Sequence, residues 1–220
     1  MIRAVIFDID GTLVDSVDLH AEAWRETFLH FGHDIPAAAV RQQIGKGGDK
    51  LLPTFLTPEE VRKTGKEVEA FRGELFMRDY MPRVKAFPRV RDLFEKIKSS
   101  GSKVALASSS DEKQLNKFKE IAGISDLVDC ETSADDAKSS KPDPDIFEAA
   151  IRCLRPVKTA DMIVVGDTPY DAEGAAKAGL RTIGVLSGGF EERLLRDAGC
   201  IAVFRDPADL LEKSHQWLLR

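Results

Sequence analysis

AVIFDIDGT, residues 4–12, is a short apolar run that leads into two aspartates, a glycine and a threonine. A continuous apolar run is typical of a strand that is buried on both faces of a parallel sheet. Asp8 and Asp10 are two positions apart, so their carboxylates can lie on one side of an extended chain, and Gly11 permits a sharp turn. The same pattern also occurs in ordinary turns and calcium loops. Because ligands of open parallel sheets bind beyond the carboxyl ends of the strands, the stretch predicts a strand that ends at a candidate site.

Further apolar runs share the character of residues 4–7. The stronger runs are residues 103–107, 162–165 and 181–185, and the weaker ones are residues 127–130 and 200–204. Stripes of apolar residues at helical spacing lie between most of them, for example Val90, Leu93, Phe94 and Ile97. Alternating strands and helices indicate an α/β protein with a Rossmann-like, doubly wound parallel sheet.

Residues 16–82 interrupt this alternation, because they contain helical patterns and no convincing strand pattern. Ser16 can cap a helix whose apolar residues recur every three or four positions. Residues 57–60 read TPEE, which has the composition of a capping box at the start of a second helix. Between the two helices, residues 44–50 form a glycine-rich turn, IGKGGDK. We therefore expect two domains: an α/β core of residues 1–15 and 83–220, and an inserted all-helical cap of residues 16–82.

The composition is that of a soluble globular protein, with 220 residues, 43% apolar residues and a net charge of −5. The chain has no long basic run and no apolar run that could cross a bilayer, so we expect neither a nucleic-acid partner nor a membrane. Cys130, Cys153 and Cys200 are dispersed and odd in number, which predicts reduced thiols and a cytoplasmic location. The sequence leaves open whether the protein is a monomer or a homodimer.

Polar residues follow other predicted strands as well. Ser108 comes directly after residues 103–107, and hydroxyl and free N–H groups at a strand end can bind an anion. Asp167 follows residues 162–165, and Asp171 comes one helical turn later. Lys141 lies in SKPDP, where two prolines stiffen the loop. Taken alone, this lysine is better interpreted as a solvated surface residue than as a fixed charge.

Taken together, the strand ends are expected to bring Asp8, Asp10, Asp167 and Asp171 to one edge of the sheet, near Lys141. Four clustered carboxylates repel one another unless a cation compensates their charge. Hard oxygen ligands with room for water and a phosphate suit Mg²⁺. The sequence therefore predicts a Mg²⁺ site formed by the four aspartates.

These motifs, in this order, resemble those of the haloacid dehalogenase-like (HAD) hydrolase superfamily. The matching segments are DIDGT at residues 8–12, Ser108 after Leu-Ala, Lys141 in SKPDP and GDTPYD at residues 166–171. The helical insertion after the first motif is similar to the small cap of the phosphoglycolate phosphatase-like and β-phosphoglucomutase-like branch. The resemblance implies a Mg²⁺-dependent phosphatase that hydrolyses a small phosphorylated metabolite, of the phosphoglycolate or sugar phosphate type, through an aspartyl-phosphate intermediate.

The resemblance also implies a role for each matching residue. Asp8 is expected to be the nucleophile and a metal ligand, and Asp10 the general acid and base, with its backbone carbonyl on the metal. Ser108 is expected to hydrogen-bond a phosphoryl oxygen, and Lys141 to pair with Asp8 and the phosphate. Asp167 is expected to bind the metal directly, and Asp171, at the same metal site, to hold a metal-bound water or to orient the loop.

The cap is expected to close over the substrate and to set its specificity. Lys46 and Lys50, in the glycine-rich turn, are expected to face the leaving group. His20 has two equal interpretations, as a leaving-group contact and as a packing residue at the domain hinge. The residues predicted to lie near the substrate or in the cap are Thr12, Ser109, His20, Lys46 and Lys50.

A phosphosugar mutase is the alternative enzyme. His20 and Trp24 stand where phosphoglucomutase-like members carry histidine and tryptophan, but residues 44–50 lack the arginine that those members use for a second phosphate. Gly166-Asp167 also replaces their glutamate–aspartate pair, so a phosphatase ranks above a mutase. A phosphorylated signalling domain without turnover is an alternative from another class. Such domains place the phosphoacceptor after a later strand and have no helical insertion.

Overall fold

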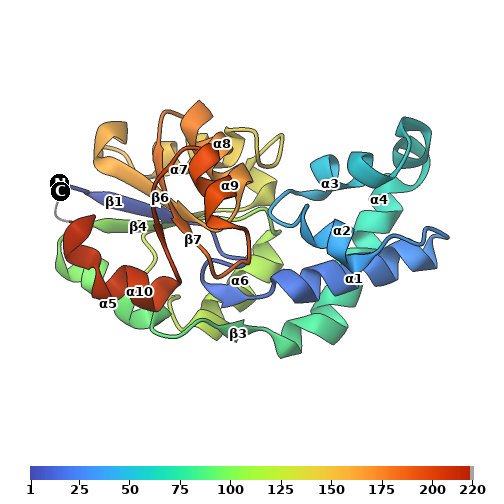
Figure 1. The fold of residues 1–220 in the computed structure, drawn as a ribbon, viewed down its shortest axis with the longest axis horizontal. Helices are drawn as coiled ribbons and strands as arrows, with labels where there is room; N and C mark the ends of the chain where they lie inside the picture. The colour runs from blue at the N-terminus through green and yellow to red at the C-terminus, as the bar shows by residue number, and fades with distance from the viewer. Residues whose placement is uncertain (219–220) are drawn as a thin grey trace.

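The computed structural model of the chain describes residues 1–218, and its centre is a parallel sheet of six strands (Figure 1). In spatial order the strands are β5 (Cys130–Thr132), β4 (Lys103–Ala107), β1 (Ala4–Phe7), β6 (Met162–Gly166), β7 (Arg181–Val185) and β8 (Cys200–Phe204). Neighbouring strands in this order are parallel. The chain winds outward from β1 in both directions, so the predicted doubly wound α/β fold is confirmed.

Helices cover both faces of the sheet (Figure 1). One face packs against α5 (Val90–Ser99), α6 (Glu112–Ala122) and α10 (Pro207–Glu212), and the other against α7 (Asp145–Cys153), α8 (Pro169–Lys177) and α9 (Glu192–Asp197). The side chains of β1 alternate between these layers: Val5 and Phe7 join the first, and Ala4 and Ile6 the second. All four are fully buried, which explains why this strand is apolar at every position.

A second group of helices lies beside the carboxyl ends of the strands (Figure 1). It consists of α1 (Val17–His30), α2 (Ala37–Arg41), α3 (Gly48–Phe55), α4 (Pro58–Leu75), the π-helical turn η1 (Phe76–Tyr80) and the 3₁₀ turn η2 (Met81–Arg83). Two short antiparallel strands, β2 (Val14–Asp15) and β3 (Lys85–Ala86), connect this group to the sheet. Several of its buried side chains form a cluster separate from those of the sheet, which includes Trp24, Phe28 and Val68. The other 3₁₀ turns are η3 (Ala134–Asp136), η4 (Thr159–Asp161) and η5 (Ser214–Gln216).

The two predicted helix starts have different outcomes. Thr57 begins α4 with a complete capping box, because its hydroxyl accepts from Glu60 N–H and the Glu60 carboxylate accepts from Thr57 N–H at 2.8 Å. Ser16 precedes α1, but its hydroxyl donates to Asp10 and does not cap the helix. The prediction of Ser16 as a side-chain cap is therefore wrong, and its hydroxyl instead orients a candidate site residue.

Two predictions about residues 127–153 are also wrong. The strand that the sequence predicts at residues 127–130 is β5, which begins only at Cys130. The chain first reaches β4 one residue earlier, at Asp129. Asp129 N–H donates to Val104 O at 2.9 Å, and the Asp129 carboxylate accepts from Val104 N–H at 2.7 Å. Cys130 is joined to Cys153 by a disulfide between β5 and α7, so these two are not the free thiols that their dispersed spacing predicts. Cys200 is a free, buried thiol. Within residues 1–218, no helix is both long enough and apolar enough to cross a bilayer.

Candidate active site

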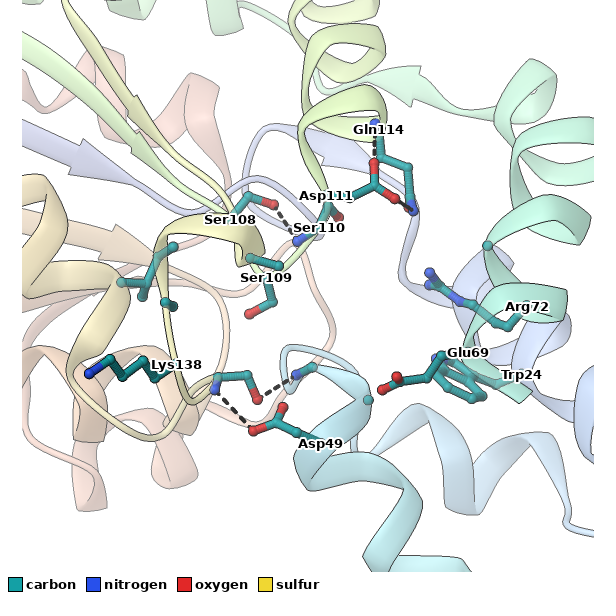
Figure 2. Close-up of a pocket in the computed structure, with 17 residues that line it drawn as sticks. Trp24, Asp49, Glu69, Arg72, Ser108, Ser109, Ser110, Asp111, Gln114 and Lys138 are labelled. Atoms are coloured by element: carbon teal, nitrogen blue, oxygen red, sulfur yellow. Dashed lines mark hydrogen bonds between the residues drawn. The ribbon is translucent and has the colours of Figure 1, made fainter. Parts of the chain in front are cut away.

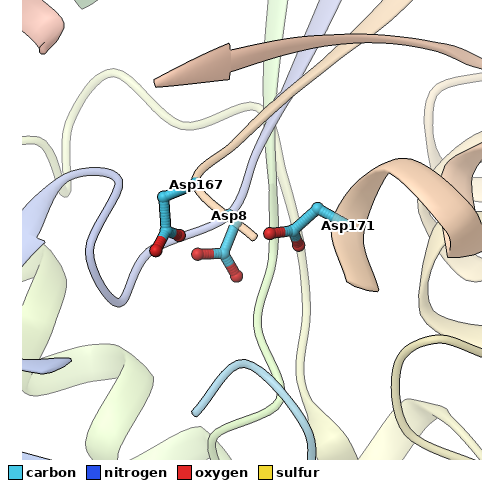
Figure 3. Close-up of side chains that lie close together, drawn as sticks. All are labelled: Asp8, Asp167 and Asp171. Atoms are coloured by element: carbon cyan, nitrogen blue, oxygen red, sulfur yellow. The ribbon is translucent and has the colours of Figure 1, made fainter. Parts of the chain in front are cut away.

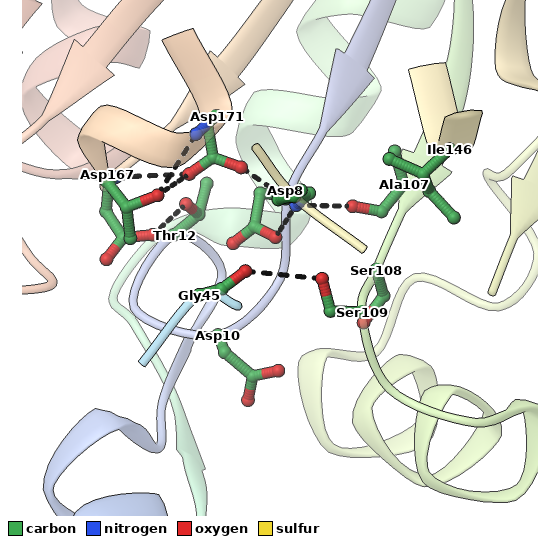
Figure 4. Close-up of polar contacts among 12 residues, drawn as sticks. Asp8, Asp10, Thr12, Gly45, Ala107, Ser108, Ser109, Ile146, Asp167 and Asp171 are labelled. Carbon is green, nitrogen blue, oxygen red and sulfur yellow. Dashed lines mark hydrogen bonds and ion pairs between the residues drawn. The ribbon is translucent and has the colours of Figure 1, made fainter. Parts of the chain in front are cut away.

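The Asp8 carboxylate lies at the carboxyl end of β1, between the ends of β4 and β6, where Asp8 N–H donates to Val165 O at 2.9 Å. Figure 4 shows Asp8 beside Asp167 and Asp171. Lys141 reaches Asp8 from the loop before α7. The Lys141 ammonium is fully buried and lies 2.5 Å from Asp8 Oδ1 and 2.9 Å from Ala107 O. It also pairs with Asp171 Oδ1 at 2.8 Å. Lys141 is therefore a fixed positive charge inside the protein, and its interpretation as a surface lysine is wrong.

Asp8, Asp167 and Asp171 bring their carboxylates together from β1, the end of β6 and the first turn of α8 (Figure 3). All three are buried, and one oxygen from each lies within 4.8 Å of the others. Thr12 Oγ1 donates to Asp167 Oδ1 at 3.0 Å, and Thr168 Oγ1 donates to Asp171 Oδ2 at 2.7 Å. Within residues 1–218, buried Asp167 Oδ2 has no hydrogen-bond partner.

The electrostatics of this cluster suit a bound cation. Burial raises the pKa of Asp8 to about 7, against the opposing effect of Lys141 and with a further increase from Asp171. Burial and the neighbouring carboxylates also raise the pKa of Asp167 well above its usual range. Burial lowers the pKa of Lys141, but Asp171 and Asp8 outweigh it and hold that pKa above the usual range. A buried set of oxygen donors with one unpartnered oxygen and unfavourable mutual repulsion fits a hard divalent cation such as Mg²⁺.

Asp10 points away from this cluster, toward α1. Its Oδ1 accepts from Ser16 Oγ and lies 2.7 Å from His20 Nε2. An Arg72 N–H donates to His20 Nδ1, so the ring proton lies on Nε2 and is donated to Asp10. Burial raises the pKa of Asp10, but His20, Ser16 and Arg72 more than offset it and leave that pKa below the usual value. Burial lowers the pKa of His20, which favours the neutral ring.

The helical group is closed over the sheet. Hydrogen bonds join it to the core in both directions. From the core, Ser109 Oγ donates to Gly45 O at 3.2 Å and Tyr170 Oη donates to Gln42 O at 2.6 Å. From the helical group, Gly47 N–H donates to Ser140 Oγ at 2.9 Å. Lys50 makes an ion pair across the same boundary with Asp143 at 2.8 Å.

The glycine-rich turn permits this approach. A Cβ at Gly45 would lie 2.8 Å from Thr168 Cγ2, and one at Gly47 would lie 2.7 Å from Ser140 Cβ. Lys46 bonds to Gln43 Oε1 at 2.6 Å and lies over the Tyr170 ring. Residues 44–50 therefore mainly form contacts between the helical group and the α/β core.

Two adjoining cavities lie beneath the closed cap. The inner cavity, of about 70 Å³, is lined by Asp8, Asp10, His20 and Lys46 among others. The outer cavity, of about 370 Å³, lies between α4 and the start of α6 (Figure 2). The residues that line both are Trp24, Gly47, Gly48, Arg72, Ser109 and Ser110. A small group can therefore lie beside Asp8 while the rest of the same molecule fills the outer cavity.

The other predicted site residues lie in different surroundings, some at a cavity and some in contacts between protein groups. Ser108 is fully buried, accepts from Ser110 N–H at 3.1 Å and lines the outer cavity. Thr12 contacts Asp167, and Lys50 lies in the cap–core contact.

Sequence reasoning missed other residues of the site. Arg72 lies on α4, of which the sequence shows only the apolar stripe. A Cβ at Gly188 would lie 1.6 Å from Asp167 Oδ2, so this glycine leaves room for the carboxylate. The sequence contains no pattern that signals either residue.

Comparisons with known proteins agree with this geometry. The family model described as haloacid dehalogenase-like hydrolase matches residues 2–179. The chain is 32% identical over 205 residues to Protein SUPPRESSOR OF QUENCHING 1, chloroplastic, of Arabidopsis thaliana. The matched region covers 90% of the chain but only 19% of that protein. It is 28% identical to Phosphorylated carbohydrates phosphatase of Thermotoga maritima, over 95% of the chain and 96% of the relative. It is 30% identical to Phosphoglycolate phosphatase of Aquifex aeolicus, over 84% of the chain and 85% of the relative.

A solved structure is similar over nearly the whole chain. It is the structure of a hydrolase from Pseudomonas syringae, which has a TM-score of 0.90 and 25% sequence identity and covers 99% of each chain.

Proposed function

The chain belongs to the haloacid dehalogenase-like hydrolase family, and from this premise we propose that it is a Mg²⁺-dependent phosphatase whose Asp8 takes up the phosphoryl group of a small phosphorylated metabolite. The observation that carries the proposal is the position of the buried Asp8 carboxylate. It lies 2.5 Å from the Lys141 ammonium, clusters with Asp167 and Asp171 and lines a cavity beside Asp10. The relatives named as phosphatases support the reaction class, and two of those names support phosphoglycolate or a phosphorylated carbohydrate as the substrate type.

Asp8 is the nucleophile in this proposal. Its free carboxylate oxygen attacks phosphorus, a bond forms between that oxygen and phosphorus, and the bond to the leaving oxygen breaks. Lys141 favours the ionised form of Asp8 and balances the negative charge of the phosphoryl group. The buried Ser108 hydroxyl lies at the same strand edge and would donate to a phosphoryl oxygen. Mg²⁺, held by Asp8, Asp167 and Asp171, would offset further charge on the phosphoryl oxygens.

Asp10 is the general acid and base. Its pKa lies below the usual value in the substrate-free protein, so it would take up a proton when the negative charge of the bound phosphate raises that pKa. It gives this proton to the leaving oxygen in the first step and takes one from the attacking water in the second, when the bond between phosphorus and Asp8 breaks. The His20 N–H at 2.7 Å fixes the orientation of the Asp10 carboxylate. Asp10 would promote hydrolysis of the phosphorylated Asp8. A signalling domain without turnover does not need such a residue.

Turnover should therefore require the metal. We expect a generic ester, p-nitrophenyl phosphate, to be hydrolysed with Mg²⁺ and to remain intact with chelator, and re-addition of Mg²⁺ to restore phosphate release. The thermal midpoint should also rise when Mg²⁺ binds. At a concentration about 100 times Kd, binding contributes about 2.7 kcal/mol, which corresponds to a rise of about 5–10 °C for a chain of this size.

This rise should be larger at pH 8 than at pH 5. The Asp8 pKa is about 7 in the folded protein, against an ordinary value of 3.8 for an aspartate, so the metal-free folded state loses stability as pH rises through this window. Mg²⁺ binds the ionised carboxylates and relieves that loss. Asp167→Asn should abolish the rise, and Asp34→Asn, at an exposed carboxylate, should preserve it. An equal rise at both pH values, or in Asp167→Asn, would contradict the assignment of the metal site.

We further propose that residues 16–82 move as a cap about β2 and β3, opening to admit the substrate and closing for the reaction. Gly45→Ala should then weaken closure, because Gly45 has a φ of +107° and its added Cβ would meet Thr168. Strain of about 1–3 kcal/mol in the closed form should raise KM by about tenfold.

The matched control is Gly32→Ala. Gly32 has a φ of +85° but no atom within 4 Å of its added Cβ, so this change should lower the thermal midpoint without raising KM. An unchanged KM in Gly45→Ala, measured in the same assay, would show that this turn does not control closure.

A further inference from the structure

The outer cavity is bordered mainly by negative charge. Asp49, Glu69 and Asp111 contribute carboxylates to its lining, while Arg72 contributes a guanidinium (Figure 2). Lys138 also borders it, but its side chain extends away from Asp49 and Glu69 (Figure 2). The site that would receive the leaving group is therefore unfavourable for a second anion.

Two of the three carboxylates already bind protein groups. Asp111 caps α6, accepting from Gln114 N–H at 2.8 Å and from Gln114 Nε2 at 2.9 Å. Asp49 accepts from Ser140 N–H at 3.1 Å. Both keep their negative charge, so they contribute to the potential of the cavity while having less capacity to accept further hydrogen bonds.

Glu69 is the available acceptor. Its carboxylate lies directly against Gly48, where an added Cβ would be 1.8 Å from Glu69 Oε1, so the absence of a side chain at Gly48 admits it to the cavity wall. Burial and the charge of Asp49 raise the pKa of Glu69, and Arg72 opposes them. No hydrogen bond from a group within the described residues 1–218 contributes to this shift in the Glu69 pKa.

The Arg72 guanidinium is already compensated. It lies 5.3 Å from the Trp24 ring and 5.0 Å from the Phe76 ring and donates to His20 Nδ1. Burial lowers the pKa of Arg72 to about 10, although Asp10, Asp111 and Glu69 raise it. Its buried Nε has no hydrogen-bond partner within residues 1–218. Arg72 therefore keeps Nε as a free N–H donor, while Asp10, Asp111 and Glu69 offset its positive charge.

We propose that the outer cavity selects an uncharged polyhydroxyl leaving group, that of a sugar phosphate or polyol phosphate, and that Glu69 is the residue that disfavours anionic leaving groups. The proposal rests on the proposed phosphatase function. A hydroxyl can donate to Glu69 and accept from Arg72 Nε, which matches both unfilled positions. The Trp24 ring offers an apolar face for the carbon skeleton. An anionic leaving group, such as glycolate or a second phosphate, would meet three carboxylates around one guanidinium in the outer cavity.

Two esters of nearly the same shape test this inference. Glycerol 3-phosphate releases neutral glycerol, and 3-phosphoglycerate releases an anion. We expect kcat/KM to favour glycerol 3-phosphate by at least about tenfold at low salt. Glu69→Gln should reduce that ratio by about tenfold, because it removes the charge and keeps the shape. Glu69→Asp should retain the preference, and Glu67→Gln, at an exposed glutamate of the same helix, should leave the ratio unchanged.

p-Nitrophenyl phosphate separates the two levels of the proposal. If every protein hydrolyses it but 3-phosphoglycerate is preferred, or if Glu69→Gln leaves the ratio unchanged, the charge selection is wrong and the phosphatase function stands. If the native protein hydrolyses none of the esters with Mg²⁺, the proposed function and this inference both fall. Circular dichroism of Glu69→Gln and Glu69→Asp should match that of the native protein.

Discussion

Asp8→Asn should fold normally and lose at least about four orders of magnitude in kcat, since the amide has nearly the same shape but no nucleophilic oxygen anion. The fold should tolerate the change for two reasons. Lys141 keeps its contacts with Asp171 at 2.8 Å and with Ala107 O at 2.9 Å. Burial already disfavours the ionised form of Asp8 in the metal-free protein, so a neutral side chain at this position removes an unfavourable charge.

The measurement is phosphate release from p-nitrophenyl phosphate with Mg²⁺, together with the thermal midpoint without metal. We expect a midpoint no lower than that of the native protein and no detectable turnover. Asp15→Asn, at an exposed aspartate of β2, should retain native turnover. Substantial activity in a correctly folded Asp8→Asn would remove the nucleophile assignment.

Asp10→Asn should produce the second large effect, a loss of about 10²–10⁴ in kcat, because it removes the proton donor and acceptor. The loss should depend on the leaving group. An alkyl phosphate releases a strongly basic oxygen that needs a proton, whereas p-nitrophenolate leaves without one. The rate of the first step should therefore fall further for glycerol 3-phosphate than for p-nitrophenyl phosphate.

The second step should also slow, because Asp10 no longer takes a proton from water. Phosphorylated Asp8 should then accumulate in rapid-quench experiments with p-nitrophenyl phosphate and be detected by mass spectrometry. Glu22→Gln, on the exposed side of α1, is the control and should behave as the native protein. Equal losses for both esters without an accumulated phosphoenzyme would contradict a proton-transfer role for Asp10.

Much of the fold could be predicted from the sequence, because it depends on local patterns. The apolar runs at residues 4–7, 103–107 and 162–165 lie in strands, and the capping box at Thr57 begins α4. The weaker run predicts a strand at residues 127–130, earlier than the observed Cys130–Thr132, because apolar residues in a turn resemble the start of a strand. Leu127 and Val128 pack against the core from that turn. The pairing of Cys130 with Cys153 depends on how β5 and α7 meet, which spacing along the chain does not show.

The residues of the candidate site also include some that the sequence predicts correctly and some that it does not. The sequence predicts that Asp8, Asp10, Asp167 and Asp171 converge, because the carboxyl ends of parallel strands share an edge. Asp8, Asp167 and Asp171 do so, whereas the Asp10 carboxylate lies against His20. Ser16 was predicted as a cap, although its hydroxyl bonds to Asp10. The roles of all these residues stay predictions until the variants are measured.

The sequence by itself determined most of the strands, where α4 begins and which acidic side chains follow the strands, since these depend on residue periods of about 2 and 3.6 and on neighbouring caps. Only the tertiary structure decided that Lys141, which the resemblance alone pairs with Asp8, is fully buried, and that Arg72 lies beside His20 across 52 positions. It also decided that Glu69 lies against Gly48 at the cavity wall. These neighbours depend on which helix face packs on which strand end, and that arrangement is set by long-range burial of the whole chain rather than by local preference.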